Sequence, residues 1–140
     1  MYFVTSEPLD AESLTRSAML ETSGAVITFL GVVRRFSRGK RVEWLEYEAY
    51  PEMAVKTFAQ IGDEVKSRWP VDFVGVLHRT GRMEVGDVSL VVVVGSPHRK
   101  EAYEASQYCV DRLKEIAPIW KKEVWEVGEV WIEGRSEEHT

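Results

Sequence analysis

The chain has 140 residues, close to the commonest size of one domain and enough to bury a hydrophobic core. Its formal charge is 18 minus 23, or −5, which disfavours a nucleic-acid-binding protein that relies on a broad basic surface. Its one cysteine, Cys109, excludes an internal disulfide and multi-cysteine metal sites, and no long apolar run or basic leader is present, so we expect one soluble, cytoplasmic domain over residues 1–140 without a membrane segment.

A short leading strand or coil is expected first, followed by a modest helix in "PLDAESLTRSAMLE" (8–21). The next stretch, "GAVITFLGVV" (24–33), is almost wholly apolar, which predicts a strand covered on both faces. The polar, glycine-containing "RRFSRGK" (34–40) is expected to be a loop.

"VEWLEYEAY" (42–50) alternates as a half-buried strand, with Leu45 and Tyr47 on one face and Glu46 on the other. Pro51 then opens a long helix that carries an apolar stripe and ends at Trp69-Pro70.

Two further strands are expected at 71–79 and 87–96, separated by a turn in "TGRMEVG" (80–86). A second long helix follows, for which Ser96 suits the N-cap and Pro97 the first helical position. This helix ends before Pro118.

The chain closes with two strands, 119–127 and 129–134, that turn at Gly128, and with a polar tail from about residue 135. The order is strand, strand, helix, given twice, between an initial helix and a final strand pair. Short connections between neighbouring strands predict an α+β fold with a largely antiparallel sheet. No Gly-rich phosphate loop, Gly-x-Ser-x-Gly elbow or His-Glu-x-x-His occurs, so those enzyme classes lose support.

Basic residues cluster in three places: "RRFSRGKR" (34–41), "HRK" (98–100), and Lys114 with "WKK" (120–122). The second cluster lies in the first turn of a helix, where unpaired N–H groups already make the potential positive and each exposed cation costs roughly 0.3 to 1 kcal/mol. This placement favours a bound anion over a solvated turn. Local positive pockets in an acidic protein suit a small anionic ligand.

Several single residues allow two interpretations. Cys109 lies on the apolar stripe of its helix and His78 at a strand end, so core packing is favoured for both. Arg34 leaves an apolar strand and is either a solvated strand end or a guanidinium held for a phosphate or carboxylate. Phe29, on the same strand, is interpreted as core.

Lys114 and Lys121 flank the Pro118 break. A lysine in the last turn of a helix is ordinarily a partner of the helix dipole, which suits Lys114. Lys121 follows two apolar residues, and partial burial there would make its amine easier to deprotonate. Spacing alone does not decide between the two as the chemically active amine.

Seven stretches resemble, in order, the large catalytic subunit of molybdopterin synthase, the MoaE family. They are "GAVITFLGVVR", "LEYEAYPEMA", "RWPV", "VLHRTGRMEVGD", "SPHRKEAYEA", "LKEIAPIWKKE" and "WIEGR", from Gly24 to Arg135, or about four-fifths of the chain. Each stretch is modest alone, and the ordered set is highly specific.

The resemblance implies the MoaE-like α/β hammerhead fold and a sulfurtransferase of molybdenum cofactor synthesis. Such an enzyme converts cyclic pyranopterin monophosphate into molybdopterin by installing two dithiolene sulfurs. The sulfur arrives as a thiocarboxylate on the C-terminal Gly-Gly of a small ubiquitin-like subunit of the MoaD type. The large subunits form a homodimer within a heterotetramer, and neither a metal nor a cofactor is implied.

By motif match, the resemblance also implies a set of substrate-binding residues. They are Phe29, Val32, Val33, Arg34, His98, Arg99, Lys122, Glu123 and Arg135. Some family members carry lysine at the position of Val32. Lys114 is expected to be the central catalytic residue, as an acid and base or as a covalent amine, and Lys121 to stabilise oxyanionic charge.

Helix geometry adds a hypothesis about the assembly. His98 and Lys114 are sixteen residues apart on one helix, which corresponds to about 24 Å and exceeds the reach of one small substrate. Each pocket is therefore expected to combine Arg34 and the two lysines of one chain with His98 and Arg99 of its dimer mate. Two rival functions remain: a non-catalytic docking module for a ubiquitin-like tail or a small phosphate, and an acyl or phosphoryl transferase.

Overall fold

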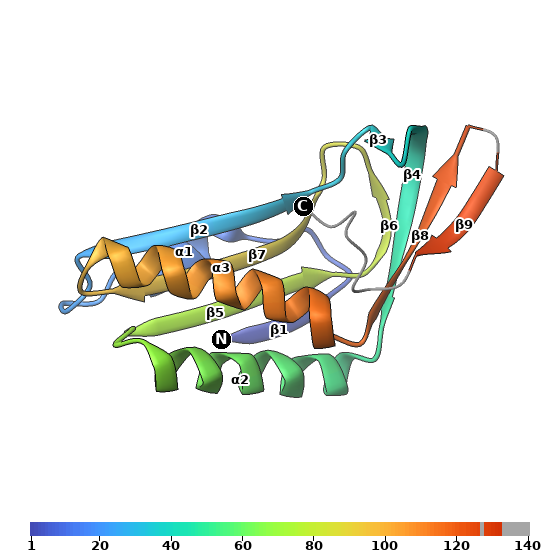
Figure 1. The fold of residues 1–140 in the computed structure, drawn as a ribbon. Coiled ribbons are helices and arrows are strands. Elements are labelled where there is room, and N and C mark those ends of the chain that lie inside the picture. Colours follow the sequence, from blue (N-terminus) through green and yellow to red (C-terminus); the bar gives the residue numbers. More distant parts are fainter. Residues whose placement is uncertain (127, 133–140) are drawn as a thin grey trace.

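The computed structural model describes residues 1–126 and 128–132, the last five by their backbone alone. In this part of the chain helices pack on one sheet, and a second sheet lies at one end of the molecule (Figure 1). The helices are α1 (Ala11–Ser17), α2 (Pro51–Arg68) and α3 (Arg99–Ile116). The predicted α+β class is confirmed.

The first sheet has the strand order β1-β5-β7-β2. Its strands are β1 (Tyr2–Thr5), β5 (Phe73–Arg79), β7 (Val88–Ser96) and β2 (Ala25–Val32). The β5–β7 and β7–β2 pairs are antiparallel, as expected, whereas β1 pairs with β5 in parallel. The leading segment is thus a strand that extends the sheet.

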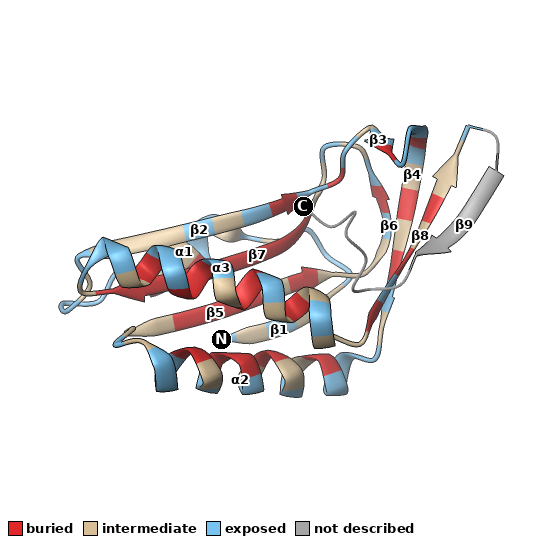
Figure 2. Cartoon of the chain, in the orientation of Figure 1, coloured by how far each residue is buried: buried red, intermediate tan, exposed pale blue. Residues whose placement is uncertain are grey.

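β7 is buried on both faces, which explains its run of valines (Figure 2). Val92 and Val94 belong to the main core, together with apolar residues of α2 and α3. Val91 and Val93 belong to a second cluster that includes Leu14 of α1. Because successive strand residues point to opposite faces, helices on both sides require an apolar residue at every position.

The expected covering of 24–33 on both faces is wrong for one side of β2. Leu30 and Val32 are 43% and 40% exposed, and Thr28 on the same face touches Thr15 of α1 with a hydroxyl–hydroxyl distance of 2.7 Å. α1 has only seven residues, so it ends before it can cover the rest of this edge strand. The apolar run predicted the strand correctly, but not its one open face.

The helical stripes follow the predicted periodicity. In α2 the buried residues include Phe58, Ile61 and Val65, and in α3 they include Cys109 and Leu113. Burial raises the pKa of the Cys109 thiol to about 12, so the thiol is a protonated core group. The core-packing interpretation of this cysteine is confirmed.

The second sheet has the order β3-β4-β8-β9, and β6 also pairs with β4. Its strands are β3 (Phe36–Ser37), β4 (Lys40–Ala49), β6 (Gly81–Glu84), β8 (Ile119–Trp125) and β9 (Gly128–Ile132). The final strand pair is confirmed, but Gly128 is not its turn, because Gly128 pairs with Trp125 as the first residue of β9.

Two segments that were expected to be loops contain strands. Residues 34–40 form the short β3, joined to β4 by a turn in which Arg38 and Gly39 have φ of 53° and 73°. Positive φ at both central residues is the geometry of a tight hairpin turn. Residues 80–86 contain β6, which pairs with β4. Both strands are short, and each has one large apolar residue, so neither shows a hydrophobic period and both are defined by their pairing with β4.

The predicted ends of two helices need correction. α1 is shorter than 8–21, and it begins after Asp10, whose carboxylate accepts a bond from the Ser13 N–H at 3.0 Å. Ser96 is not the N-cap of α3: it ends β7, where its carbonyl accepts a bond from the Gly24 N–H at 2.9 Å. His98 occupies the N-cap position instead, without a side-chain capping bond.

Candidate active site

A small cavity of about 20 Å³ lies where the two sheets meet. The end of β2, the start of β7, and the strands β4 and β8 form its walls. Its lining residues are Gly31, Val32, Val33, Arg34, Leu45, Tyr47, Ser89, Leu90, Lys121 and Glu123. Five of the residues singled out from the sequence are therefore brought together, although they come from segments almost ninety positions apart.

Lys121 and Glu123 form a buried ion pair in this cavity. The Lys121 Nζ and Glu123 Oε2 atoms are 3.4 Å apart, and the two side chains are 4% and 3% exposed. Alternate residues of β8 share one face of the strand, so both point the same way. The indole N–H of Trp125 donates a hydrogen bond of 3.0 Å to the same carboxylate. A buried charge pair requires such additional bonds because desolvation of each ion costs several kcal/mol.

Lys114 lies in the last turn of α3, close enough to the cavity to sense its charges. Burial lowers the pKa of the Lys114 amine, Asp111 opposes this shift, and the positive charges of Lys121 and Arg34 lower the pKa further. The helix ends at Ala117, and β8 begins at Ile119, so the Pro118 break carries the chain from Lys114 into the strand that bears Lys121. Arg34 and Lys121 thus line the cavity, and Lys114 lies near enough for the charges of both to act on its amine.

Two polar residues of the cavity lining, Tyr47 and Ser89, were not identified as site residues from the sequence. Tyr47 is hydrogen-bonded to Ser89, whose hydroxyl lies 3.3 Å from the Gly31 carbonyl oxygen. The alternation of β4 placed Tyr47 on the core face beside Leu45, which is where it lies. A phenol among apolar neighbours was the one signal that could have marked it, because a buried hydroxyl needs a partner.

His78 is buried next to Tyr47, as the core interpretation predicted. Its ring meets that of Tyr47 edge to face, with centroids 4.8 Å apart. Its Nδ1 lies 2.9 Å from the Arg79 carbonyl oxygen, an acceptor, so Nδ1 carries the proton. Burial lowers the pKa of His78 to about 4, and the imidazole is neutral at pH 7.

His98 and Arg99 lie outside the cavity. Both are exposed at the start of α3, whereas Lys114 is near its other end. At 1.5 Å per residue the separation is about 24 Å, as the sequence suggested. Within one chain these two residues do not join the cluster of Arg34, Lys114 and Lys121.

The remaining candidates differ in position. Phe29 is partly buried against the main core, and one of its ring carbons comes within 3.7 Å of where a Cβ on Gly31 would lie. Lys122 points to the other face of β8, where its Nζ is 4.0 Å from a Glu46 carboxylate oxygen. Arg135 lies outside the described residues. The roles of all three stay predictions.

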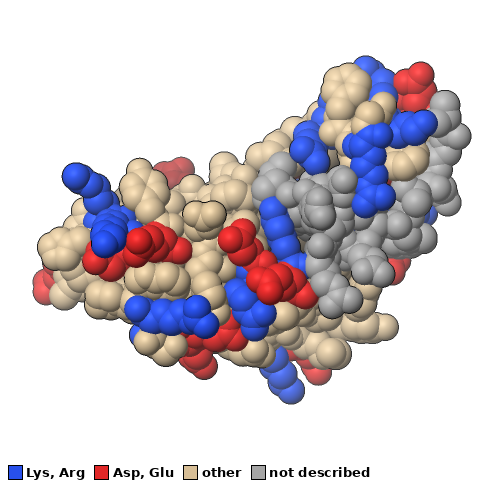
Figure 3. Space-filling view, in the orientation of Figure 1, with Lys and Arg blue, Asp and Glu red and all other residues tan. Residues whose placement is uncertain are grey.

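Basic side chains also gather on the β3–β4 hairpin, next to the cavity (Figure 3). Arg34, Arg38, Lys40 and Arg41 are exposed there, so an anion that approaches the cavity meets a positive surface. Among the described residues, no group of three or more His, Cys, Asp or Glu side chains could hold a metal ion. None of the described helices combines the length and apolar character needed to cross a bilayer.

Comparison with known proteins matches this architecture. A family model described as "MoaE protein" matches residues 4–116. The molybdopterin synthase catalytic subunit of Halalkalibacterium halodurans is 47% identical over 131 residues, 94% of this chain and 84% of the relative. That of Bacillus subtilis is 46% identical over 129 residues, 92% of this chain and 82% of the relative.

A solved structure is also similar to this chain. The crystal structure of molybdopterin synthase from Staphylococcus aureus superposes with a TM-score of 0.89 at 45% identity, and the match covers 93% of this chain and 95% of that one. Family model, relatives and fold together show that the chain belongs to the MoaE family, that of the catalytic subunits of molybdopterin synthase.

Proposed function

We propose that this chain catalyses the sulfur-transfer step of molybdopterin synthesis at the cavity between its two sheets. Family membership supplies the reaction class, which is sulfur transfer in molybdenum cofactor synthesis. In the proposed reaction, the C-terminal thiocarboxylate of a small ubiquitin-like subunit gives sulfur to cyclic pyranopterin monophosphate. The observation that carries the residue assignment is that Arg34 and Lys121 line one cavity and that the charges of both act on the Lys114 amine.

The charges of this site suit the proposed reaction. The substrate carries a cyclic phosphate, and sulfur attack and ring opening develop further negative charge. Fixed cations in a water-poor site stabilise such charge more strongly than solvent does. Arg34 leaves a rigid strand, and its planar guanidinium suits bidentate contact with a phosphate. The proposed role of Arg34 is therefore to hold the substrate.

The two lysines receive different proposed roles. Lys114 has a lowered pKa, so a larger fraction of its amine is neutral at a given pH than in an ordinary lysine. It suits a proton acceptor and donor or a covalent amine, and both remain open. Lys121 forms a buried ion pair with Glu123, which suits it to stabilise oxyanionic charge near the thiocarboxylate.

The cavity is narrow enough to favour an extended peptide end over a whole pterin. About 20 Å³ has room for little more than one water molecule, so the pterin would lie at the more open surface near Arg34 and Lys114. A C-terminal Gly-Gly has no side chain to obstruct such an entrance. We therefore assign the inner cavity to the terminal thiocarboxylate group of the small partner subunit, with the rest of its tail at the entrance.

The assembly is proposed to be a homodimer of this chain that carries one small subunit at each end. His98 and Arg99 are too far from Lys114 in the same chain to share a small substrate, and both are exposed. A partner chain could bring its own copies of these two residues to the cavity. The exposed residues Leu30 and Val32 of the edge strand β2 provide an apolar surface beside the cavity.

Reconstitution from purified components tests this function. The chain is mixed with cyclic pyranopterin monophosphate and with the small subunit, prepared either as the thiocarboxylate or as the ordinary carboxylate. We expect the dithiolene to form only in the mixture that contains the thiocarboxylate. Mass spectrometry of the pterin product measures it. If the two proteins bind each other but no sulfur reaches the pterin, the chain is a docking module. Turnover without the thiocarboxylate would instead indicate an acyl or phosphoryl transferase.

A further inference from the structure

Tyr47 is the neighbour of Lys121 across the β4–β8 ladder. The two residues are Cα partners in this antiparallel pair, and Leu45 is the partner of Glu123. Side chains of directly opposed residues share one face of a sheet, with Cβ atoms about 4.5 to 5.5 Å apart. Tyr47, Lys121 and Glu123 therefore line the same cavity from two adjacent strands.

The phenol of Tyr47 is held by a hydrogen bond and by a ring contact. Its hydroxyl is hydrogen-bonded to Ser89, and the Ser89 hydroxyl donates to the Gly31 carbonyl oxygen at 3.3 Å. The phenol is thereby joined through Ser89 to the backbone of β2. The His78 ring packs against the tyrosine ring with an interplanar angle of 78°. Tyr47 is only 5% exposed, so it has little freedom to turn.

The geometry points to Tyr47 as a positioning residue that fixes the Lys121–Glu123 pair through the bond chain Tyr47–Ser89–Gly31. This inference rests on the proposed function for its catalytic consequence, but not for its structural one. The phenol held by this chain lines the same cavity as Lys121 and is its neighbour across the strand ladder, so a fixed hydroxyl dipole lies next to the ion pair. Burial raises the pKa of Tyr47 to about 12, and the phenol therefore stays neutral across the working range of pH.

Among the described residues, the neighbours of Lys121 include three charged groups and the uncharged Tyr47. Glu123 is on the same strand, Arg34 follows β2, Lys114 lies near the end of α3, and Tyr47 is on β4. Two of these groups repel an ammonium, and one attracts it. A rigid neutral dipole that holds the ammonium toward Glu123 opposes this repulsion without adding a charge that would bind the substrate competitively.

Two variants break this bond chain while leaving the rings packed. Tyr47→Phe deletes the hydroxyl and keeps the contact with His78, and Ser89→Ala removes the middle link of the chain. Tyr108→Phe is the matched control, because its hydroxyl is bonded to Glu64 on the helical side of the molecule. Since Ser89→Ala changes a residue other than Tyr47, the test survives if Tyr47→Phe folds poorly.

The first measurement needs no catalysis. Nitrogen-15 NMR of the lysine side chains reports whether the protons of the Lys121 ammonium exchange slowly enough to be seen, with Lys121→Met used for assignment. We expect a resolved signal in the wild type and in Tyr108→Phe, and its loss by fast exchange in Tyr47→Phe and Ser89→Ala. A Lys121 signal that is unchanged in the two cavity variants, or absent from the wild type, overturns the positioning role.

The second measurement separates this inference from the proposed function. In steady-state sulfur transfer, Tyr47→Phe should lower kcat about 10- to 100-fold with KM for the pterin nearly unchanged, as displaced catalytic groups do. Ser89→Ala should act the same way, and the double variant should be no slower than Tyr47→Phe. If the wild type transfers no sulfur but the NMR contrast is present, the proposed function fails and the positioning role stands. Equal kcat in the wild type and both variants overturns the catalytic consequence of that role.

Discussion

Lys114 and Lys121 carry the same side chain in different electrostatic surroundings. Lys121 is buried against the Glu123 carboxylate at 3.4 Å, which favours the charged form. Lys114 is only partly buried, and burial together with two neighbouring cations lowers its pKa. A site that needs both a fixed positive charge and a group that exchanges protons obtains them from two lysines seven positions apart.

The charge of Arg34 should shift the pH dependence of Lys114. Arg34→Gln removes a cation that disfavours the protonated amine, so the pKa of Lys114 should rise toward its ordinary value. If the neutral amine acts in catalysis, the rising limb of the single-turnover rate against pH should move to higher pH. Lys56→Gln, an exposed change on α2, is the control and should leave the limb in place. A limb that stays in place in Arg34→Gln would contradict the electrostatic coupling.

His78 should make the stability of the fold depend on pH. Its pKa is lowered from 6.5 to about 4, so between these values the unfolded chain binds a proton that the folded chain does not. Its stabilising contribution is complete above pH 6.5 and is lost as the pH falls toward 4, by roughly 3 kcal/mol in all. Urea unfolding at several pH values measures this slope, which His78→Gln should flatten in that window. An equal slope in the wild type and the variant would refute the assignment to His78.

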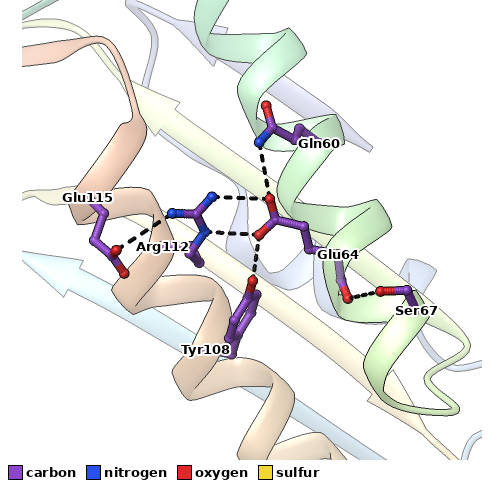
Figure 4. Close-up of polar contacts among 6 residues, drawn as sticks. All are labelled: Gln60, Glu64, Ser67, Tyr108, Arg112 and Glu115. Carbon is purple, nitrogen blue, oxygen red and sulfur yellow. Dashed lines mark hydrogen bonds and ion pairs between the residues drawn. The ribbon is translucent and has the colours of Figure 1, made fainter.

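At the scale of elements, a polar network joins α2 to α3 and so holds the helix that presents Lys114 (Figure 4). The Arg112 guanidinium donates two hydrogen bonds to Glu64, of 2.9 and 3.1 Å, and Tyr108 and Gln60 donate to the same carboxylate. These bonds lower the pKa of Glu64 to about 2, and Arg112 is the largest cause. Arg112 and Lys114 are two positions apart, so the network lies one half-turn from the site.

Breaking this network should loosen α3 more than it disturbs the cavity. Glu64→Gln removes the carboxylate, so the thermal midpoint at pH 7 should fall by a few degrees, and Gln60→Ala, which loses one peripheral bond, should change it little. Because the folded pKa of Glu64 is depressed, the stability it contributes is present above about pH 4.5 and is lost as the pH falls toward 2. The difference between wild type and Glu64→Gln should therefore shrink in acid. A difference that grows in acid would contradict this sign.

The elements that could be predicted from the sequence are those with a periodic apolar pattern. α2 and α3 show their stripes plainly, and β7 shows an unbroken apolar run. β3 and β6 were not predicted because both are too short to show a hydrophobic period and are defined by their pairing with β4. Ser96 looked like a cap, but its backbone is already used in the pairing of β7 with the chain before β2. Tertiary pairing overrode local preference in each of these segments.

At the scale of the whole molecule, the site is a product of the junction between two sheets. β2 and β7 bring Arg34 and Ser89 to one wall, and β4 and β8 bring Tyr47 and Lys121 to the other. The charged members could be predicted because basic clusters and the family resemblance marked them. Tyr47 and Ser89 could not, since neither belongs to a motif of charge or spacing, and their importance arises only when the two sheets meet.

A mixed dimer tests whether pockets are shared between chains. When a Lys114→Ala chain pairs with an Arg99→Ala chain, one pocket carries both changes and the other carries neither. Shared pockets predict about half of the wild-type activity from this heterodimer, although each parental homodimer is inactive. Differently tagged chains allow the heterodimer to be purified and assayed for sulfur transfer. A heterodimer as inactive as both parents would place Arg99 and Lys114 in the same pocket of one chain.

The most direct test of the account is the rate at which the chain converts the cyclic pterin into the two-sulfur dithiolene product. With thiocarboxylated small subunit and cyclic pterin in excess, the wild type and the surface control Lys56→Ala should both form the two-sulfur dithiolene product. Lys114→Ala, with its fold verified by circular dichroism, should be slower by about 10² to 10⁴-fold, the contribution expected of a group that moves protons in the transition state. Equal product from Lys114→Ala and the wild type would contradict the assignment of the catalytic centre to this cluster of cations.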